Sequence, residues 1–312
     1  MGVALIFPGQ GSQAVGMGRA LAENFPAAKA VFDEVDAALG EKLSDFIWNG
    51  PEQDLTLTRN AQPALMAVSL AALRVLETEK GLDLKRDVAG VAGHSLGEYS
   101  ALAAVGSLAI GDTARLLRIR GDAMQKAVPV GQGAMAALLG ADAAQAKAIA
   151  IEAAQGEVCE VANDNGGGQV VVSGAHAAIG RAVEIAKTRG VKRAMLLPVS
   201  APFHCSMMAP AAEVMAEALA NVAIAAPAIP VYANVIAGPV TDPAEIRRNL
   251  VAQVTGTVRW RETMVAMSAA GMSRFVEIGS GKVLAGLAKR VVEGASASSI
   301  GTPEDIAAFT LA

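Results

Sequence analysis

The sequence has few cysteines, no excess of basic residues and no metal-binding pattern. Cys159 and Cys205 are too few for a disulfide framework, so nothing indicates an oxidising compartment and we expect a cytoplasmic protein. The 26 Lys and Arg residues against 30 Asp and Glu residues give a net charge of −4, the wrong sign for general nucleic-acid binding. No His-x-x-x-His or Cys-x-x-Cys pair occurs, and we expect no metal site.

The sequence also lacks a long unbroken apolar run. A long uncharged stretch, Asn221 to Thr241, contains three prolines that would break a membrane-spanning helix, and it predicts loop, strand and loop instead. The apolar run from Val3 to Phe7 is only as long as a strand, and no Lys or Arg precedes it, so we expect no secretory signal. We therefore expect no association with a membrane.

The residues that are present predict a compact α/β protein. With 312 residues, 53% of them hydrophobic and 18% charged, the chain can form one large domain or a main domain with a smaller one inserted. Short apolar runs at 3–7 and 88–92 predict strands that precede helical patterns. We predict further helices at 27–39, 60–76, 98–104, 112–127, 208–219 and as a pair between 243 and 269, and further strands near Val231 and at 274–278.

The segment from about 129 to 198 has its own order of elements. We predict strand 134–139, helix 141–154, strands 158–162 and 169–173, helix 177–188 and strand 194–197. This βαββαβ order is that of a ferredoxin-like unit. The predicted organisation is a main domain of residues 1–128 and 199–312 that is interrupted by an inserted subdomain at 129–198.

Ser95 lies in Gly93-His94-Ser95-Leu96-Gly97, which matches the Gly-x-Ser-x-Gly nucleophile elbow. In such an elbow the flanking glycines let a strand and a helix pack closely, while a strained turn exposes the serine hydroxyl. A predicted strand precedes this motif and a predicted helix follows it. Ser95 is therefore our candidate nucleophile, and a tight turn without chemistry is the alternative.

A serine hydroxyl needs a base, and the chain has only three histidines. His94 adjoins Ser95 and should point away from it, and His176 lies at the start of a predicted helix. His204 lies in a proline-stiffened, uncharged loop that favours a neutral imidazole near pH 7, so it is our candidate base. A buried structural histidine is the alternative. No acid stands out as a third member, which predicts an imidazole oriented by a carbonyl or an amide.

Arg120 falls in the middle of the apolar stripe of its predicted helix, which Thr113, Leu116, Leu117 and Met124 form. Burying an unpaired guanidinium costs several kcal/mol, so Arg120 needs an anion. Its planar fork suits a carboxylate held by two hydrogen bonds. That carboxylate belongs either to an internal Asp or Glu or to a ligand.

Two glycine-rich segments also follow predicted strands. Phe7 to Gln13 lacks the glycine and lysine spacing of nucleotide-binding loops, which leaves a loop whose backbone N–H groups can face an anion. Gly279 to Lys282 continues with Val283 instead of Ser or Thr, so it predicts a strand-to-helix turn and not a phosphate loop.

Together, these motifs resemble those of the malonyl-CoA:acyl carrier protein transacylases of fatty acid synthesis. The resemblance covers nearly the whole chain and implies an α/β-hydrolase-like main domain with a parallel sheet and an inserted ferredoxin-like subdomain. It rests on Phe7-Pro8-Gly9-Gln10-Gly11-Ser12-Gln13, Gly93-His94-Ser95-Leu96-Gly97-Glu98, Arg120-Gly121-Asp122-Ala123-Met124-Gln125, Pro202-Phe203-His204, Gln253 before Trp260, and Glu277-Ile278-Gly279-Ser280-Gly281-Lys282-Val283-Leu284.

The resemblance implies a role for each candidate residue. Ser95 would be the nucleophile and His204 its base, and the backbone carbonyl of Gln253 would orient the imidazole. Arg120 would hold the malonyl carboxylate.

Four further residues would complete the site. The backbone N–H groups of Gln10 and Leu96 would form the oxyanion hole. Phe203 would exclude branched acyl groups, and Asn163 would approach the cleft from the subdomain.

The resemblance also implies the reactants. Malonyl-CoA would be the substrate, coenzyme A the leaving group and the phosphopantetheine thiol of acyl carrier protein the acceptor, with no permanently bound cofactor. Other functions stay open: an acyltransferase of a polyketide or malonate decarboxylase system, a serine thioesterase or hydrolase, and a carrier-binding module without activity. A basic group is a candidate docking patch for an acidic carrier, with a solvated helix end as the alternative. It consists of Lys187, Arg189, Lys192 and Arg193.

Overall fold

Two β-sheets organise the chain, of which the computed structural model describes residues 2–199 and 201–310. Within these residues the first sheet has six strands in the order β10-β9-β1-β2-β7-β8, and all neighbours are parallel except β7 and β8. This largely parallel sheet confirms the α/β main fold. Its strands are β1 (Gly2–Phe7), β2 (Gly90–Gly93), β7 (Val231–Ala233), β8 (Gly238–Val240), β9 (Met272–Ile278) and β10 (Ser296–Ile300).

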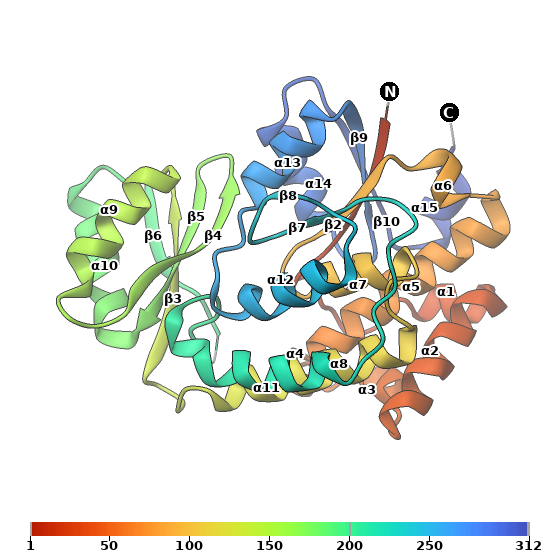
Figure 1. Ribbon diagram of the computed structural model, residues 1–312, viewed down its shortest axis with the longest axis horizontal. Helices are drawn as coiled ribbons and strands as arrows, with labels where there is room; N and C mark the ends of the chain where they lie inside the picture. The colour runs from red at the N-terminus through yellow and green to blue at the C-terminus, as the bar shows by residue number, and fades with distance from the viewer. Residues whose placement is uncertain (1, 200, 311–312) are drawn as a thin grey trace.

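The second sheet is antiparallel and lies to one side of the first, at the left of Figure 1. Its strand order, β4-β5-β3-β6, is that of a ferredoxin-like unit, which confirms the predicted βαββαβ segment. It has its own hydrophobic core. The domain boundaries at 129 and 198 stay a prediction. The elements are β3 (Gly133–Leu139), α9 (Ala143–Ala154), β4 (Cys159–Gly166), β5 (Gln169–Ala175), α10 (His176–Thr188) and β6 (Arg193–Leu196).

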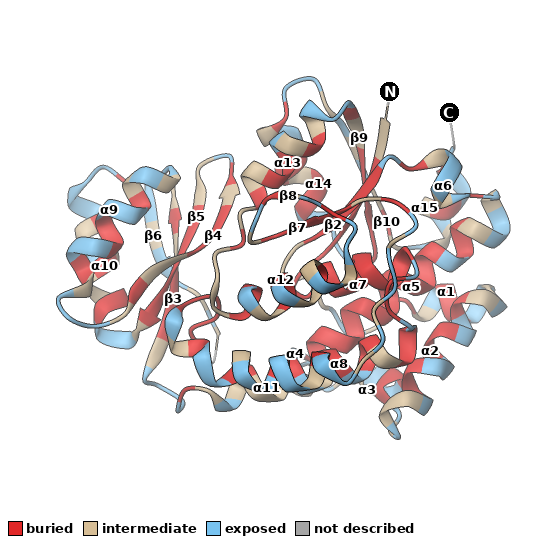
Figure 2. Ribbon diagram, viewed as in Figure 1, coloured by how far each residue is buried: buried red, intermediate tan, exposed pale blue. Residues whose placement is uncertain are grey.

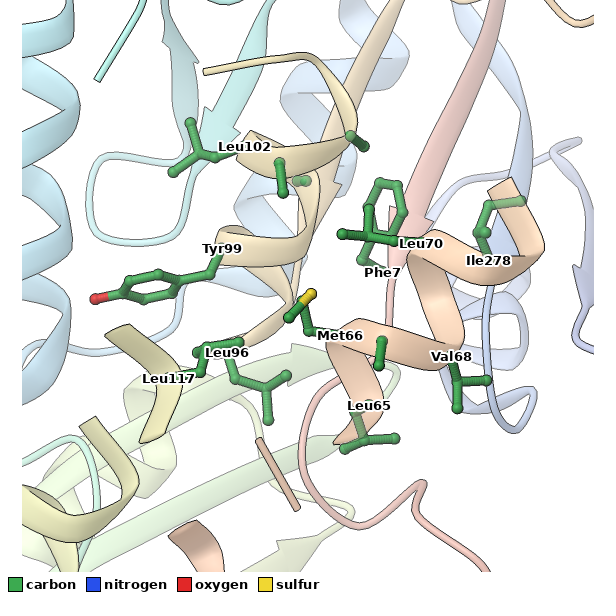
Figure 3. Close-up of a cluster of buried hydrophobic side chains, with 14 of the residues drawn as sticks. Phe7, Leu65, Met66, Val68, Leu70, Leu96, Tyr99, Leu102, Leu117 and Ile278 are labelled. Atoms are coloured by element: carbon green, nitrogen blue, oxygen red, sulfur yellow. The ribbon is translucent and has the colours of Figure 1, made fainter. Parts of the chain in front are cut away.

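Helices cover both faces of the parallel sheet, so its central strands are buried on both sides. On β1, Ala4 and Ile6 join one buried cluster with α13 (Trp260–Ala269) and α14 (Val283–Val291). Leu5 and Phe7 point to the opposite face, because side chains alternate along a strand, and join the larger core with α5 (Thr58–Lys80). Figure 3 shows Phe7 beside Leu70 of this helix, and Figure 2 shows that most of α5 is buried.

The remaining helices surround this core. None of the helices within the described ranges combines the length and the apolar character needed to cross a bilayer. They are α1 (Arg19–Asn24), α2 (Pro26–Leu39), α3 (Leu43–Asn49), α4 (Glu52–Thr56), α6 (Leu84–Asp87), α7 (Gly97–Ala104), α8 (Ile110–Lys126), the short 3-10 helix η1 (Ser206–Met208), α11 (Ala209–Ala220), α12 (Pro243–Thr255) and α15 (Pro303–Ala308).

The structure adds elements that the sequence did not predict. The predicted loop after Val231 contains β8, and the polar segment of β10 pairs with β9 at the sheet edge. Both are edge strands, which need no continuous apolar run because one side faces solvent or loops. Five short helices, α1, α3, α4, α6 and α15, were also missed, whereas α14 begins directly after the strand-to-helix turn that was predicted at 279–282.

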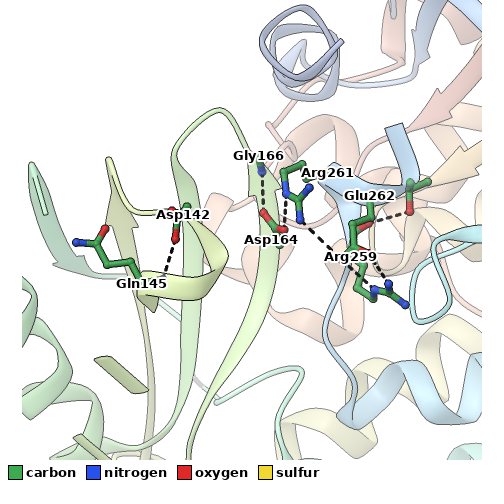
Figure 4. Close-up of polar contacts among 8 residues, drawn as sticks. Asp142, Gln145, Asp164, Gly166, Arg259, Arg261 and Glu262 are labelled. Carbon is green, nitrogen blue, oxygen red and sulfur yellow. Dashed lines mark hydrogen bonds and ion pairs between the residues drawn. The ribbon is translucent and has the colours of Figure 1, made fainter. Parts of the chain in front are cut away.

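The two sheets are joined at the end of β4. Asn163 forms an isolated parallel bridge with Val258, and the Asp164 N–H donates to the Val258 carbonyl at 3.0 Å. Arg261 of α13 also pairs with Asp164 at 2.8 Å, as Figure 4 shows. Backbone and side-chain contacts therefore hold β4 against the main domain.

Candidate active site

A cleft of about 510 Å³ opens where the parallel strands end. Gln10 follows β1 and Ser95 follows β2, two neighbouring strands whose carboxyl ends lie at the same edge, the usual position of sites in parallel sheets. The second sheet forms another wall. The residues around the cleft include Gln10, Gln62, Ser95, Leu96, Arg120 and Met124 of the main domain, Met135, Asn163 and Leu197 of the segment 129–198, and Phe203 and His204 after it.

Ser95 occupies a strained turn between β2 and α7. Its φ of 54° lies in the left-handed region, which costs an L-residue about 1–3 kcal/mol and persists only where the surroundings enforce it. The flanking glycines explain how the turn fits. A Cβ on Gly93 would lie 1.8 Å from the Gly97 carbonyl oxygen, and one on Gly97 would lie 2.3 Å from that of Phe7. The motif therefore forms the elbow that its spacing predicts.

His204 contacts Ser95 directly. Its Nε2 lies 2.8 Å from the Ser95 Oγ, and its Nδ1 lies 2.9 Å from the backbone carbonyl of Gln253. A carbonyl can only accept, so Nδ1 carries the proton and Nε2 is free to accept from the serine hydroxyl. Burial, and secondarily the positive charge of Arg120, lowers the pKa of His204 to about 3, so the imidazole is neutral at pH 7.

Arg120 is the second group at the serine. It is 1% exposed, and one of its terminal nitrogens lies 3.2 Å from Ser95 Oγ and 2.9 Å from the Gln253 Oε1. The other donates to Gln62 Oε1 at 2.8 Å, while Nε, also buried, has no hydrogen-bond partner in the described ranges. Burial lowers the pKa of Arg120.

No carboxylate among the described residues forms an ion pair with Arg120. The nearest compensation comes from Glu98, whose Oε2 accepts from Gln253 Nε2 at 2.8 Å while Gln253 Oε1 accepts from the guanidinium. One amide therefore separates the guanidinium from the Glu98 carboxyl group. Arg120 lines the cleft, and its hydrogen-bond partners there, Gln62, Ser95 and Gln253, are uncharged.

Two backbone donors also border the cleft. The N–H groups of Gln10 and Leu96 make no hydrogen bond within residues 2–199 and 201–310, although both residues line the cleft beside Ser95. Leu96 immediately precedes α7, so its N–H adds to the positive end of the helix dipole. The Gln10 side chain donates to Thr58 Oγ1 at 3.3 Å, which fixes the loop.

Residues 4–307 match the family model of the acyl transferase domain. The malonyl CoA-acyl carrier protein transacylase of Bacillus subtilis is 45% identical over 305 residues, which cover 97% of this chain and 95% of that protein. This chain belongs to the acyl transferase family.

Solved acyl transferases share the whole architecture. The crystal structure of acyl-carrier-protein-S-malonyltransferase from Bartonella henselae is 57% identical, with a TM-score of 0.96 over 99% of this chain and 98% of that chain. A malonyl-transacylase in complex with a type II PKS acyl-carrier protein is 40% identical, with a TM-score of 0.95 over 98% of each chain. The two-sheet arrangement is thus that of known acyl transferases.

The other candidate residues of this acyl transferase are divided between the cleft and the rest of the molecule. Phe203 and Asn163, 8% and 6% exposed, both line the cleft. His94 also lines the cleft, but its Nε2 contacts Asn165 Oδ1 at 2.9 Å and not Ser95. His176 is exposed at the first turn of α10. Only one histidine therefore contacts the serine.

Three polar residues of the acyl transferase site were not predicted as site residues. Gln62 binds Arg120, and Glu98 and Asn234 bind the elbow and Gln253. Each is at most 2% exposed. Gln62 and Asn234 interrupt apolar segments of the sequence, and a buried polar side chain needs a hydrogen-bond partner, so that interruption was the available signal.

Proposed function

We propose that this protein transfers the malonyl group of malonyl-CoA to the phosphopantetheine thiol of an acyl carrier protein, through a malonyl-serine on Ser95, for fatty acid synthesis. One observation carries the proposal. The Ser95 Oγ meets the neutral imidazole of His204 at 2.8 Å and the buried guanidinium of Arg120 at 3.2 Å. A nucleophile, its base and a carboxylate receptor therefore converge on one atom.

In the first half-reaction, Ser95 Oγ attacks the malonyl thioester carbonyl and His204 Nε2 takes the hydroxyl proton. A carbon–oxygen bond forms, and the tetrahedral oxyanion accepts hydrogen bonds from the N–H groups of Gln10 and Leu96. The carbon–sulfur bond then breaks. His204 returns its proton to the departing thiolate, and coenzyme A leaves.

The second half-reaction repeats these steps in reverse. The thiol of the carrier's phosphopantetheine arm attacks the malonyl-serine, and His204 accepts the thiol proton. The serine oxygen leaves and recovers a proton from His204. This ping-pong sequence needs one base and one oxyanion hole for both transfers.

Arg120 selects for malonyl because its present partners, Gln62 and Gln253, are neutral amides. The malonyl carboxylate would give the buried cation an anion, whereas an acetyl group would not, and a site built for a charge strongly rejects an analogue that lacks it. Phe203, beside the base, would crowd a branched methylmalonyl group.

Two alternatives share this chemistry. A polyketide or malonate decarboxylase acyltransferase would use the same residues. The polyketide alternative is favoured by one structural relative, the malonyl-transacylase in complex with a type II PKS acyl-carrier protein. A thioesterase would hydrolyse the acyl-serine. The absence of a triad acid at His204 Nδ1, where the Gln253 carbonyl accepts instead, favours transfer.

Intact-mass spectrometry tests the function. Brief incubation with malonyl-CoA should add one malonyl group to the parent protein and none to Ser95→Ala. Added holo-acyl carrier protein should then remove the adduct and become malonylated itself. Loss of the adduct to water at the same rate with or without the carrier would instead indicate a hydrolase. Comparing fatty acid and polyketide carriers separates the two transferases.

Two further expectations concern the carrier docking surface and the compartment. Lys187, Arg189, Lys192 and Arg193 are all exposed, but Lys187 pairs with Glu184, and Arg189 pairs with Glu152. These pairs reduce the positive charge available to an acidic carrier. The cytoplasmic location rests on the cysteine content of the sequence.

A further inference from the structure

Asn234 lies directly behind the nucleophile elbow. It follows β7, the strand beside β2, and is fully buried. Its side-chain Oδ1 accepts from the Ser95 N–H at 2.8 Å, and its Nδ2 donates to the Gly93 carbonyl at 2.7 Å. One amide side chain thus binds both sides of the strained turn.

The opposite side of the turn is held by a second amide. The Ser95 carbonyl accepts from Gln253 Nε2 at 3.0 Å and from the Glu98 N–H at 3.0 Å. The peptide groups before and after Ser95 are therefore fixed by side chains from two distant segments. A left-handed φ at a serine requires this kind of external restraint.

Glu98 connects the two amides. Its Oε2 accepts from the Asn234 N–H at 3.0 Å and from Gln253 Nε2 at 2.8 Å. The Asn234 carbonyl accepts from the Arg259 N–H at 3.1 Å. Every polar group of Asn234 is consequently hydrogen-bonded, and Glu98, Asn234 and Gln253 form one buried network around the serine.

We propose that Asn234 is a positioning residue for Ser95, anchored by Glu98, and this inference rests on the proposed role of Ser95 as the nucleophile. Asn234 lies outside the set of described residues that line the cleft, so it does not bind substrate. Its amide holds the elbow in the conformation in which Ser95 Oγ faces His204 and the Leu96 N–H borders the cleft. Loss of the amide relaxes the turn, whereas Arg120 makes no direct hydrogen bond to Asn234 and keeps Gln62 and Gln253 as partners.

Asn234→Ala tests the proposal against a matched control, Asn249→Ala. Asn249 is also buried, lies in α12, and its Nδ2 lacks a partner in the described structure. For Asn234→Ala we expect Ser95 acylation by malonyl-CoA to slow by about 10–100-fold, because a displacement of about 1 Å at a reacting group has an effect of this size. The dissociation constant of Asn234→Ala for malonyl-CoA should stay within about threefold of the parent value, because the substitution leaves the residues that line the cleft unchanged. Asn249→Ala should match the parent in both the acylation rate and the dissociation constant.

Labelling with a fluorophosphonate probe gives a readout independent of malonyl chemistry, because the probe phosphonylates a reactive serine and releases fluoride. Asn234→Asp keeps the acceptor for the Ser95 N–H. Its neutral carboxyl group can also donate to the Gly93 carbonyl, whereas the ionised form cannot. Labelling of Asn234→Asp should exceed that of Asn234→Ala at about pH 5.5 and fall toward it at about pH 9.

The parent is measured over the same pH range, because Glu98 belongs to this network and burial raises its pKa to about 7, while Arg120 and His204 both contact Gln253. A folded Asn234→Ala variant that labels within about twofold of Asn249→Ala would overturn the proposal. So would equal labelling of Asn234→Asp and Asn234→Ala at both pH values. A parent that reacts with the probe but not with malonyl-CoA would refute the proposed function, and the labelling rates would still decide the role of Asn234.

Discussion

Two of the strand-to-helix turns at the carboxyl edge of the parallel sheet each contain a serine between glycines: the elbow at Gly93–Gly97, which holds the proposed nucleophile, and the turn that follows β9. In the elbow, Ser95 itself is left-handed, with φ 54°. In the turn after β9, which we call the Ser280 turn, the left-handed residues are Gly279 and Gly281, with φ 125° and 87°. Glycine adopts this conformation without the steric cost that a serine bears. The elbow therefore concentrates its strain at Ser95, the proposed nucleophile.

The partners of the two serines differ as well. Ser280 Oγ donates to the Ser12 carbonyl at 2.7 Å, while Ser95 Oγ contacts His204 and Arg120. Each turn also has a buried glutamate nearby. Glu277 accepts from a backbone N–H at the start of α14, whereas Glu98 binds the side chain of Gln253. Similar local sequences thus acquire different uses through contacts made by distant residues.

The largest difference between the turns should come from removing each hydroxyl. Ser95→Ala should lower malonyl transfer by at least about 10⁴-fold, because the covalent intermediate cannot form. Ser280→Ala should leave transfer within about twofold, since it loses one surface-proximal hydrogen bond. Steady-state transfer and intact mass measure both variants. A malonyl adduct on Ser95→Ala would contradict the assignment.

Adding one methyl group to each turn should show that the elbow is packed more tightly than the Ser280 turn. The Cβ of Gly93→Ala would meet the Gly97 backbone at 1.8 Å, and we expect a loss of about 4 kcal/mol or more in the free energy of unfolding, or no folding. In Gly281→Ala the Cβ would lie 3.3 Å from the Ser12 Cβ, and the left-handed backbone should cost about 1–2 kcal/mol. Urea unfolding compares the two, and equal losses would show that close strand–helix approach is not special to the elbow.

Arg120→Ala tests a feature that only the elbow has of the two turns, the buried positive charge beside its serine. We expect kcat/KM for malonyl-CoA to fall by about 10²-fold or more and discrimination against acetyl-CoA to relax, because the carboxylate loses its buried partner. Arg115→Ala is the matched control, since Arg115 lies on the exposed side of the same helix and pairs with Asp112. Competition between malonyl-CoA and acetyl-CoA measures the selectivity. Unchanged selectivity in a folded Arg120→Ala variant would reject this role.

The two buried glutamates should give the smallest effect. Burial raises the pKa of Glu98 to about 7 from 4.5, so the folded state keeps a proton that the unfolded chain has released. The free energy of unfolding should therefore decrease as the pH rises from about 4.5 to about 7. Glu98→Gln should make this decrease in the free energy of unfolding smaller by about 1–3 kcal/mol. Urea unfolding at about pH 5 and pH 8 measures it.

Glu277→Gln is the comparison, because burial also raises the pKa of Glu277. Glu277→Gln should also reduce the decrease in the free energy of unfolding that occurs as the pH rises. Only Glu98→Gln should slow Ser95 acylation as well, since the hydrogen bond of Glu277 goes to the start of α14 and not to the elbow. Retention of the full pH dependence by Glu98→Gln would contradict the raised pKa.

The sequence allowed the elbow, Arg120 and the ferredoxin-like order to be predicted, because each depends on local information. The glycine spacing between a strand and a helix marks Ser95, helical periodicity places Arg120 inward, and the order of apolar runs identifies β3 to β6. His204 could be predicted because the chain has only three histidines. The family resemblance supplied the remaining assignments.

Other features depend on which distant segments meet. Asn234 is 139 positions from Ser95, and Gln62 is 58 positions from Arg120, so neither contact can be deduced from spacing. The edge strands β8 and β10 carry weak apolar patterns because the central strands, and not the edges, fill the core. Long-range partners and sheet edges are therefore where sequence reasoning was incomplete.

The separation of Ser95 and His204 in the chain has a consequence for folding. The two residues are 109 positions apart, with the whole antiparallel sheet between them, so their contact requires the closure of a long loop. A chain that has formed the elbow but has not closed this loop holds Ser95 without the contact to His204. Under the proposed role of Ser95, its reactivity toward a serine-directed probe would report the fraction of molecules in which the loop has closed, and would serve as a gauge of the native state during refolding.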